Sequence, residues 1–567
     1  MIKYVSNLII MFVLILGCSQ IPRSYVVPKN TVKIPVKSGV YPELTLSDKL
    51  RGELNDFKNC YDIHFYRLNV DVDILSERIS GIVEFHANVI ADLDTVQFDL
   101  YKNLEIEKII HNNQSVEYYR VENSVYAILP NHSPDEQIEF TVSYSGIPKK
   151  AVRPPWDGGF VWSKDKNNNP WIGVACEGDG ASLWWPNKDH PTEEPDSMEI
   201  IITVPSNLVA VSNGKFVAKD ILENDSSDFI VEKARYTWSV KNPINNYNVT
   251  LNIGDYVVVS DTLMNNTGVQ FIDHYVLSYS KEVASEHFKQ AIDVVHYFEK
   301  VFGEYPWWED GYRLVETPYR GMEHQSAIAY GNEFENSNNY YTYDLVDYII
   351  LHETAHEWWG NNVTACDGAD VWIHESFGTY AEVMYIEEKL GKLTSIDYLM
   401  TKRKNIRNLL PMKGPRHVNY WGFDDVYWKG AWMIHTLRSV INDDPLFYNI
   451  LLEFQIENRK SIVCTEDFIQ FVNEKTNDNY HYFFDQYLYN RKPPTFEYFV
   501  SNDQLTYQWT DVNDDFEMPL IIVVNKTPVT IYPSTSSQNI TIPLHAIIEI
   551  PERYYYMAVG VYNILCK

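Results

Sequence analysis

The sequence of 567 residues is too long for one ordinary domain, and its length predicts about three or four. Hydrophobic residues make up 45% of the chain and aromatic residues 14%, which is typical of a globular protein with sizeable cores. The formal net charge of −30 argues against a nucleic-acid partner, because nucleic acid requires a basic face.

The beginning of the chain is predicted to direct it to a membrane. An apolar run from Leu8 to Leu16 is too short to span a bilayer and is typical of a signal-peptide core. The run leads into "ILGC", which resembles a bacterial lipoprotein signal and implies that Cys18 is lipidated. We therefore expect a signal peptide over 1–17, a proline-containing tether over 18–45, and a lipid-anchored protein of the bacterial cell envelope, in the periplasm or outer membrane.

Beyond the tether, the hydrophobic period divides the chain into three parts. Residues 46–260 alternate between apolar and polar, as in "GIVEFHANV", and are predicted to form a β domain. Helical spacing dominates residues 261–492, as in "KEVASEHFKQAIDVVHYFEKVFG". Residues 493–567 return to short alternating runs, such as "LIIVVN", and are predicted to form a small β-sandwich. The expected fold class is multi-domain α+β.

The remaining cysteines show no pattern of their own. They are scattered and odd in number: Cys60, Cys176, Cys366, Cys464 and Cys566. One disulfide is compatible with an exported protein, but the spacing predicts neither a disulfide framework nor a thiolate metal site.

The strongest chemical signal is the stretch "HETAHEWWGNNVTACDGADVWIHESFGTYAE", which runs from His352 to Glu382. It begins within a segment that is apolar nearly all round and is therefore predicted to be a buried helix. On that helix His352 and His356 lie one turn apart on a single face. A polar connection leads to a second predicted helix that carries Glu375. Two neutral imidazoles and one carboxylate are the ligand set of a catalytic zinc site, so we expect one Zn²⁺ per chain.

Two further carboxylates are predicted to assist this site. Glu353 is beside the first histidine but offset around the helix, where it can act as a general base without blocking the ion. Glu382 shares a helix face with Glu375 and is a candidate acceptor for an imidazole N–H. The alternative interpretation is a chance HExxH pattern on a core helix, which the helically placed third carboxylate disfavours.

Several stretches together resemble the gluzincin aminopeptidases of the aminopeptidase N type. "HETAHEWWGN" followed by "WIHESFGTYAE" resembles their zinc signature in residue type and spacing. "RGMEHQSAIAYG" resembles their exopeptidase motif, and "VYWKGAWM" resembles the segment that carries their catalytic tyrosine. "ACEGDGASLWWPNKDHPTEEPD" resembles the stretch that carries an amine-binding side chain. The resemblance covers nearly all of the chain beyond the expected signal peptide.

The resemblance implies a fold and a function. It implies an N-terminal β-saddle domain, a thermolysin-like, mostly helical catalytic domain and a C-terminal β-sandwich. It also implies zinc-dependent removal of N-terminal residues from peptides with a free N-terminus, with Tyr427 as a catalytic residue. The residues that it assigns to substrate binding are Glu177, Gly321, Met322 and Glu323.

The sequence departs from the family pattern at three points. Many members add a large helical C-terminal domain that covers the active site, and the expected form of this protein lacks it. His324 follows the motif glutamate where the family usually has asparagine. His374 likewise replaces an asparagine just before Glu375, and it is not expected to be a ligand because the glutamate completes the set.

Two other functions remain as alternatives to an aminopeptidase. A zinc endopeptidase would have no need of Glu177 and Glu323, since it does not bind a free amine. A catalytically silent, peptide-binding envelope lipoprotein would be expected to lack a ligand or the base, and the sequence retains all of them. An epoxide hydrolase side activity, as in one relative of the family, also stays open.

Overall fold

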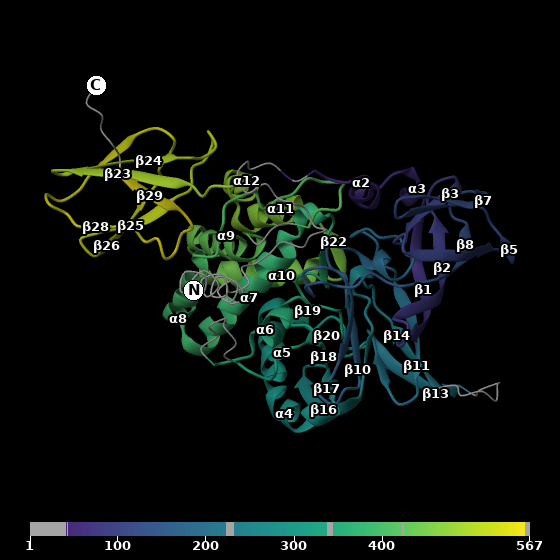
Figure 1. The fold of residues 1–567 in the computed structure, drawn as a ribbon. Helices are drawn as coiled ribbons and strands as arrows, with labels where there is room; N and C mark the ends of the chain where they lie inside the picture. The colour runs from purple at the N-terminus through teal and green to yellow at the C-terminus, as the bar shows by residue number, and fades with distance from the viewer. Residues whose placement is uncertain (1–40, 42, 223–231, 337–343, 422–424, 562–567) are drawn as a thin grey trace, which may run out of the picture. The chain divides into compact units, whose positions relative to one another are not determined.

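The structure is a computed structural model that describes residues 41, 43–222, 232–336, 344–421 and 425–561. Residues 44–567 form one compact unit, in which strands come first, helices follow and strands return (Figure 1). This order confirms the expected multi-domain α+β class. The expected signal peptide and Cys18 lie outside the described residues. In the described part of the chain, no helix combines the length and hydropathy needed to cross a membrane.

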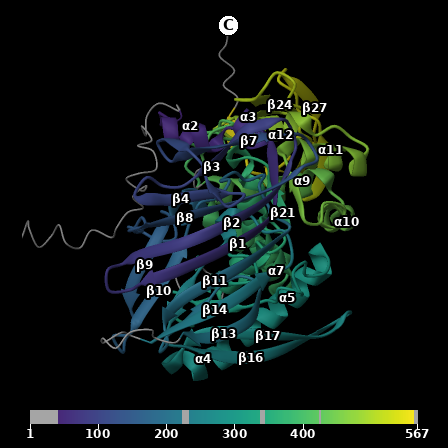
Figure 2. The same cartoon turned by 90° about the vertical axis from the view of Figure 1, so that its right-hand side faces the viewer.

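The first part of the unit is built on a large sheet. Helices α2 (Leu46–Gly52) and α3 (Asp56–Asn59) precede it. The strand order among the described residues is β13–β14–β11–β1–β2–β8–β4–β5, and Figure 2 shows several of these strands side by side. The strands are β1 (Tyr61–Asp73), β2 (Arg78–Val89), β4 (Leu104–His111), β5 (Gln114–Ser115), β8 (Gln137–Gly146), β11 (Ser197–Pro205), β13 (Lys215–Leu222) and β14 (Lys233–Val240). The predicted alternation is real, because Val83, Phe85 and Ala87 are buried while their neighbours along β2 are partly exposed.

Two smaller sheets complete this part. One has the order β12–β15–β10–β9, with β9 (Gly159–Lys164), β10 (Pro170–Ala175), β12 (Val209–Val211) and β15 (Asn252–Gly254). The other has the order β3–β7–β6, with β3 (Leu93–Asp99), β6 (Tyr118–Val121) and β7 (Ser124–His132). Short turns η2 (Ala181–Leu183) and η3 (Asn246–Asn248) lie in the connections. A continuous hydrophobic core joins these sheets.

The helical part also contains a sheet, with the order β16–β17–β18–β20–β19. Its strands are β16 (Tyr256–Asn265), β17 (Gly268–Leu277), β18 (Leu314–Glu316), β19 (Gly321–Met322) and β20 (Ile328–Tyr330). The boundary expected at residue 260 therefore falls inside β16, because the β16–β17 hairpin pairs with β18 of the helical part. The helices are α4 (Lys281–His287), α5 (Lys289–Phe302), α6 (Tyr348–Ala355), α7 (Trp372–Leu390), α8 (Lys392–Arg403), α9 (Asp425–Ile441), α10 (Asp444–Glu457), α11 (Thr465–Thr476) and α12 (His481–Tyr489).

The last part consists of two sheets in which most neighbouring strands run antiparallel. One has the order β27–β24–β23–β29 and the other β26–β25–β28. Their strands are β23 (Thr495–Ser501), β24 (Gln504–Thr510), β25 (Leu520–Val524), β26 (Thr527–Ile531), β27 (Gln538–Thr541), β28 (Ile548–Glu549) and β29 (Ala558–Val561). Their buried side chains, such as Phe496 and Trp509, belong to the same hydrophobic cluster as the helices.

A disulfide fixes the connection that leads into α7. Cys366 and Cys464 are bonded, with their Cα atoms 5.2 Å apart and a separation of 98 positions along the chain. Strands β21 (Val363–Ala365) and β22 (Ser461–Val463) pair in parallel next to this bond. Cys60 and Cys176 are buried free thiols. The polar loop between α6 and α7 is therefore held to a distant segment by a covalent bond and a strand pair.

Candidate active site

The structure brings the three predicted ligands together at the junction of α6 and α7. Asp347 caps the N-terminus of α6 by accepting from the Ile349 N–H at 2.8 Å. His352 lies on α6, and His356 is the residue at its C-terminal cap. Glu375 lies in the first turn of α7. The two helices meet so that one ligand atom of each of these three side chains lies within 4.8 Å of the others.

The spacing of these atoms fits a tetrahedral zinc ion. The two imidazole Nε2 atoms are 3.2 Å apart, and Glu375 Oε2 lies 3.6 Å from each of them. Zinc with bonds of about 2.0–2.1 Å separates its ligand atoms by roughly 3.3 Å. Glu375 Oε2 is buried and has no hydrogen-bond partner among the described residues. A buried carboxylate oxygen beside two imidazole nitrogens matches the donor set that zinc prefers.

Neighbouring groups orient both imidazoles toward the same point. His352 Nδ1 lies 2.8 Å from Glu382 Oε1, and His356 Nδ1 lies 2.9 Å from the Trp359 carbonyl oxygen. Each acceptor holds the ring proton on Nδ1, which leaves the Nε2 lone pair directed at the ion position. Glu382 therefore lies where the sequence predicted. Tyr398, which the sequence analysis missed, donates its hydroxyl hydrogen to the other oxygen of Glu382.

Glu353 lies beside the metal ligands and packs against the strand that carries the exopeptidase motif. Its side chain is buried, and a Cβ added at Gly321 would lie 2.6 Å from its Oε1 atom. Gly321 therefore leaves room for this carboxylate. Burial raises the pKa of Glu353 to about 7, a value suited to accepting and returning a proton near neutral pH.

Tyr427 reaches the site from α9. Gly430 permits a close approach of α9 to α7, because any Cβ there would overlap the Ser376 hydroxyl. Ser376 also donates to the Val426 carbonyl at 2.7 Å, which joins the two helices. The Tyr427 hydroxyl donates to Glu375 Oε1 at 2.9 Å. The phenol thus lies beside Glu375, one of the three predicted metal ligands.

A second group of carboxylates adjoins the metal ligands. One oxygen each of Glu177, Glu323 and Glu375 lies within 4.8 Å of the others. Burial and the neighbouring carboxylates raise the pKa values of Glu177 and Glu323 well above the ordinary range. Tyr247, which the sequence analysis missed, donates its hydroxyl hydrogen to Glu323 Oε1 at 3.2 Å. Three crowded carboxylates form a site that favours a cation.

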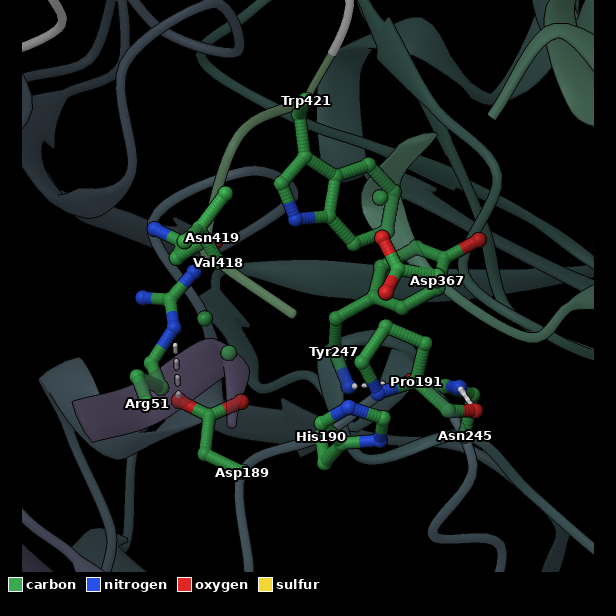
Figure 3. Close-up of a pocket in the computed structure, with 13 residues that line it drawn as sticks. Arg51, Asp189, His190, Pro191, Asn245, Tyr247, Asp367, Val418, Asn419 and Trp421 are labelled. Atoms are coloured by element: carbon green, nitrogen blue, oxygen red, sulfur yellow. Dashed lines mark hydrogen bonds and ion pairs between the residues drawn. The ribbon is translucent and has the colours of Figure 1, made fainter. Parts of the chain in front are cut away.

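A small cavity of about 20 Å³, with room for roughly one ordered water, is lined in part by Tyr247, the residue that contacts Glu323. Figure 3 shows its wall, in which Tyr247 and Trp421 lie on one side and Arg51 faces Asp189 on another. Arg51 donates to the Gly178 carbonyl at 2.5 Å and so holds the loop that carries Glu177. No motif marked Arg51, because it lies 127 residues before its partner.

The two histidines that depart from the family pattern do not belong to the group of predicted metal ligands. His374 Nε2 accepts a hydrogen bond from the Ala365 N–H at 2.8 Å, so it is turned away from the metal ligands. His324 is buried beside Glu323. Burial lowers the pKa values of both histidines to about 3, which keeps them neutral at ordinary pH. Neutral His324 does not oppose a cation at Glu323. Met322 is also buried, next to that glutamate.

Comparison with known proteins identifies the helical part. Residues 283–487 match the model of the peptidase family M1 domain. A leucyl aminopeptidase of Saccharolobus solfataricus is 23% identical over 65% of this chain and 46% of its own length. Leucine aminopeptidase 2 of Lodderomyces elongisporus is 22% identical over 58% of this chain and 48% of its own length. The chain thus spans about half the length of these curated relatives.

Solved structures show the same fold. The crystal structure of an M1 zinc metallopeptidase mutant from Deinococcus radiodurans, bound to a Tyr-Ser-Ala substrate, superposes with a TM-score of 0.60. The two chains are 20% identical, and the match covers 78% of this chain and 94% of the other. This likeness shows a shared fold, and the matched domain agrees with the resemblance of the motifs. Residues 283–487 therefore match the peptidase family M1 domain, and the chain shares its fold with an M1 zinc metallopeptidase.

Proposed function

We propose that the protein is a zinc-dependent aminopeptidase that removes N-terminal residues from peptides. The observation that carries this proposal is the convergence of Glu177 and Glu323 on the metal ligand Glu375, within 4.8 Å. A peptide with a free N-terminus presents an ammonium group one residue away from the bond to be cut. The names of the relatives, which include aminopeptidases, and the peptide bound to the Deinococcus protein support the same activity.

His352, His356 and Glu375 are the residues that would hold the zinc ion. When bound, zinc supplies Lewis acidity, which lowers the pKa of water and polarises a carbonyl group. Glu353 accepts the proton of the attacking water at a carboxylate oxygen and returns it to the leaving amine. Tyr427 donates its phenol hydrogen to the carbonyl oxygen as negative charge develops there.

The remaining carboxylates position the substrate. Glu177 and Glu323 hold the α-ammonium group, which relieves the repulsion between them and fixes the distance from the N-terminus to the scissile bond. The hydroxyl of Tyr247 holds Glu323 in place. Because the site is buried, these charge interactions are screened little by water.

The test is a panel of aminoacyl fluorogenic substrates, each with a free and an acetylated amine, with and without a chelator. We expect cleavage of the free-amine substrates, its loss on chelation and its return with added zinc. The acetylated substrates should be cleaved very poorly, because an amide replaces the cation. Efficient cleavage of acetylated or internally quenched peptides would instead indicate a zinc endopeptidase, and no cleavage at all would indicate a silent peptide-binding protein.

We also propose that the protein is anchored through lipid at Cys18 in a bacterial cell envelope. The "ILGC" sequence supports this location, and so does the Cys366–Cys464 disulfide, since such bonds persist in oxidising compartments. Labelling of growing cells with a radioactive fatty acid tests it. The wild-type protein should incorporate label and Cys18→Ser should not. Absence of label in the wild-type protein would contradict the proposed lipid anchor.

A further inference from the structure

A second pair of histidines lies in the β-rich part, away from the elements of the active site. His111 ends β4, a strand of the large sheet, and His132 ends β7, a strand of the β3–β7–β6 sheet. Their Nε2 atoms are 3.3 Å apart. The two rings meet edge to face at 86°, with their centroids 5.2 Å apart. The ends of two different sheets thus bring two imidazole nitrogens to a common point.

This pair repeats the geometry of the predicted zinc ligands. In the active site the His352 and His356 Nε2 atoms are 3.2 Å apart, and their rings meet at 86° with centroids separated by 4.8 Å. One Nδ1 there faces a carboxylate and the other a backbone carbonyl. The same two kinds of acceptor orient the second pair.

The acceptors determine where the ring protons lie. His111 Nδ1 is 2.7 Å from the Glu139 carbonyl oxygen, which cannot donate, so this nitrogen carries the proton. His132 Nδ1 is 2.7 Å from Glu136 Oε2, which holds a proton there in the same way. In the neutral rings both Nε2 lone pairs then point at each other across 3.3 Å. The two lone pairs repel each other in this arrangement, and a cation between the nitrogens would remove that repulsion.

A third donor and access from solvent are both present. The Asn112 side-chain amide lies 3.0 Å from His111 Nε2, and a half turn of that amide places its oxygen toward the same point. Asn112 is exposed, and the His132 side chain is 14% exposed, so an ion can enter from solvent. Two imidazoles with an amide oxygen and water suit a divalent transition metal such as Zn²⁺.

We propose that His111 and His132, with Asn112 at the rim, bind a second divalent transition-metal ion that links the ends of β4 and β7. This ion is structural, because none of the catalytic groups lies on these strands. It connects the large sheet to the β3–β7–β6 sheet. Among the described strands, β4 and β7 are not hydrogen-bonded neighbours. Binding to the folded state alone stabilises the β-rich part in proportion to the logarithm of the ion concentration.

The test is a zinc titration of the holoenzyme that already holds one zinc per chain, at pH 8, by calorimetry and by elemental analysis of the dialysed protein. We expect the wild type to bind a second equivalent. His111→Gln and His132→Gln should each bind it at least tenfold more weakly. Each variant should keep the first equivalent and full peptidase activity, which also shows that it is folded. His296→Gln, which removes an exposed histidine elsewhere, should behave as the wild type.

A second readout separates a metal ion from a shared proton. Added zinc should raise the melting temperature of the one-zinc wild type but not that of His132→Gln. If His132 instead carries a proton on both nitrogens and donates one to His111, the wild type binds no second equivalent, and the proposal is overturned. A second equivalent that persists unchanged in a variant with both His111→Gln and His132→Gln would overturn it as well, because the ion would then bind elsewhere.

Discussion

Among the acidic residues of the site, Glu353 has a distinct environment. Glu375 presents an oxygen directly to the two histidines, and Glu177 and Glu323 each bring an oxygen close to Glu375. Glu353 lies instead against the backbone of Gly321, and burial raises its pKa to about 7. A carboxylate with this pKa can take a proton from water and release it within one catalytic cycle.

The first prediction follows from that role. Glu353→Gln keeps the size of the side chain, so zinc content and the fold should be unchanged. The kcat should fall by a factor of about 10²–10⁴, because the amide cannot accept the proton. Steady-state kinetics and metal analysis on the same sample check this. Near-normal turnover with one zinc per chain would show that another group is the base.

The second prediction concerns the space that Gly321 leaves. In Gly321→Ala the new methyl group would lie 2.6 Å from Glu353 Oε1, so the carboxylate has to move. Misplacing a catalytic group by about 1 Å can lower the rate on the order of 10². We expect a loss of that order in kcat, with unchanged zinc content. Gly560→Ala on β29, where the nearest atom belongs to the flexible side chain of Glu497, serves as the control and should keep wild-type activity.

The residues of the candidate active site that could be predicted from the sequence are those whose partners lie nearby in the chain. His352 and His356 are one helical turn apart, so periodicity alone places them together. Tyr247 could not be found in this way, because it reaches Glu323 across 76 residues and lies between two asparagines in the short element η3. Tyr398 is only 16 residues from Glu382, but it lies on α8, and its direction depends on how α8 packs on α7.

At the scale of elements, the sequence predicted whether a segment forms a helix or a strand, but not which strands pair with one another. The alternation in β2 and the helical spacing in α5 are local properties, and both elements formed as predicted. The β16–β17 hairpin also alternates, but nothing local indicates that it pairs with β18 rather than with the preceding sheets. Strand partners are chosen by long-range packing, which a single sequence does not reveal.

The third prediction concerns the Tyr427 hydroxyl, which the close packing of α9 on α7 brings to Glu375. Tyr427→Phe removes only the hydroxyl that reaches Glu375 Oε1. Loss of one donor to a developing oxyanion typically lowers the rate by about 10²–10³, so kcat should fall by that order. KM should change little, because ground-state binding does not use this hydroxyl. A higher KM with unchanged kcat would assign Tyr427 to substrate binding. A lower melting temperature with unchanged kinetics would assign it to packing.

At the scale of the whole molecule, the site is assembled from two parts of the chain. The metal ligands, Glu353 and Glu323 come from the helical part. Glu177 follows β10 of the β-rich part, and Arg51 in the last turn of α2 holds its loop. The proposed recognition of a free amine therefore requires both parts, because Glu177 and Glu323 come from different ones.

The most direct test of this account compares free-amine and N-acetylated forms of one substrate in the wild type, Glu177→Gln and Glu323→Gln. Removing one partner of a buried charge pair typically lowers kcat/KM by a factor on the order of tens to thousands. We expect such a loss on the free-amine substrate in both variants, with one zinc per chain retained. The ratio of kcat/KM between the two substrates should fall from its high wild-type value. Variants that keep both the wild-type kcat/KM and the wild-type preference for the free amine would contradict the claim that these carboxylates recognise the N-terminus.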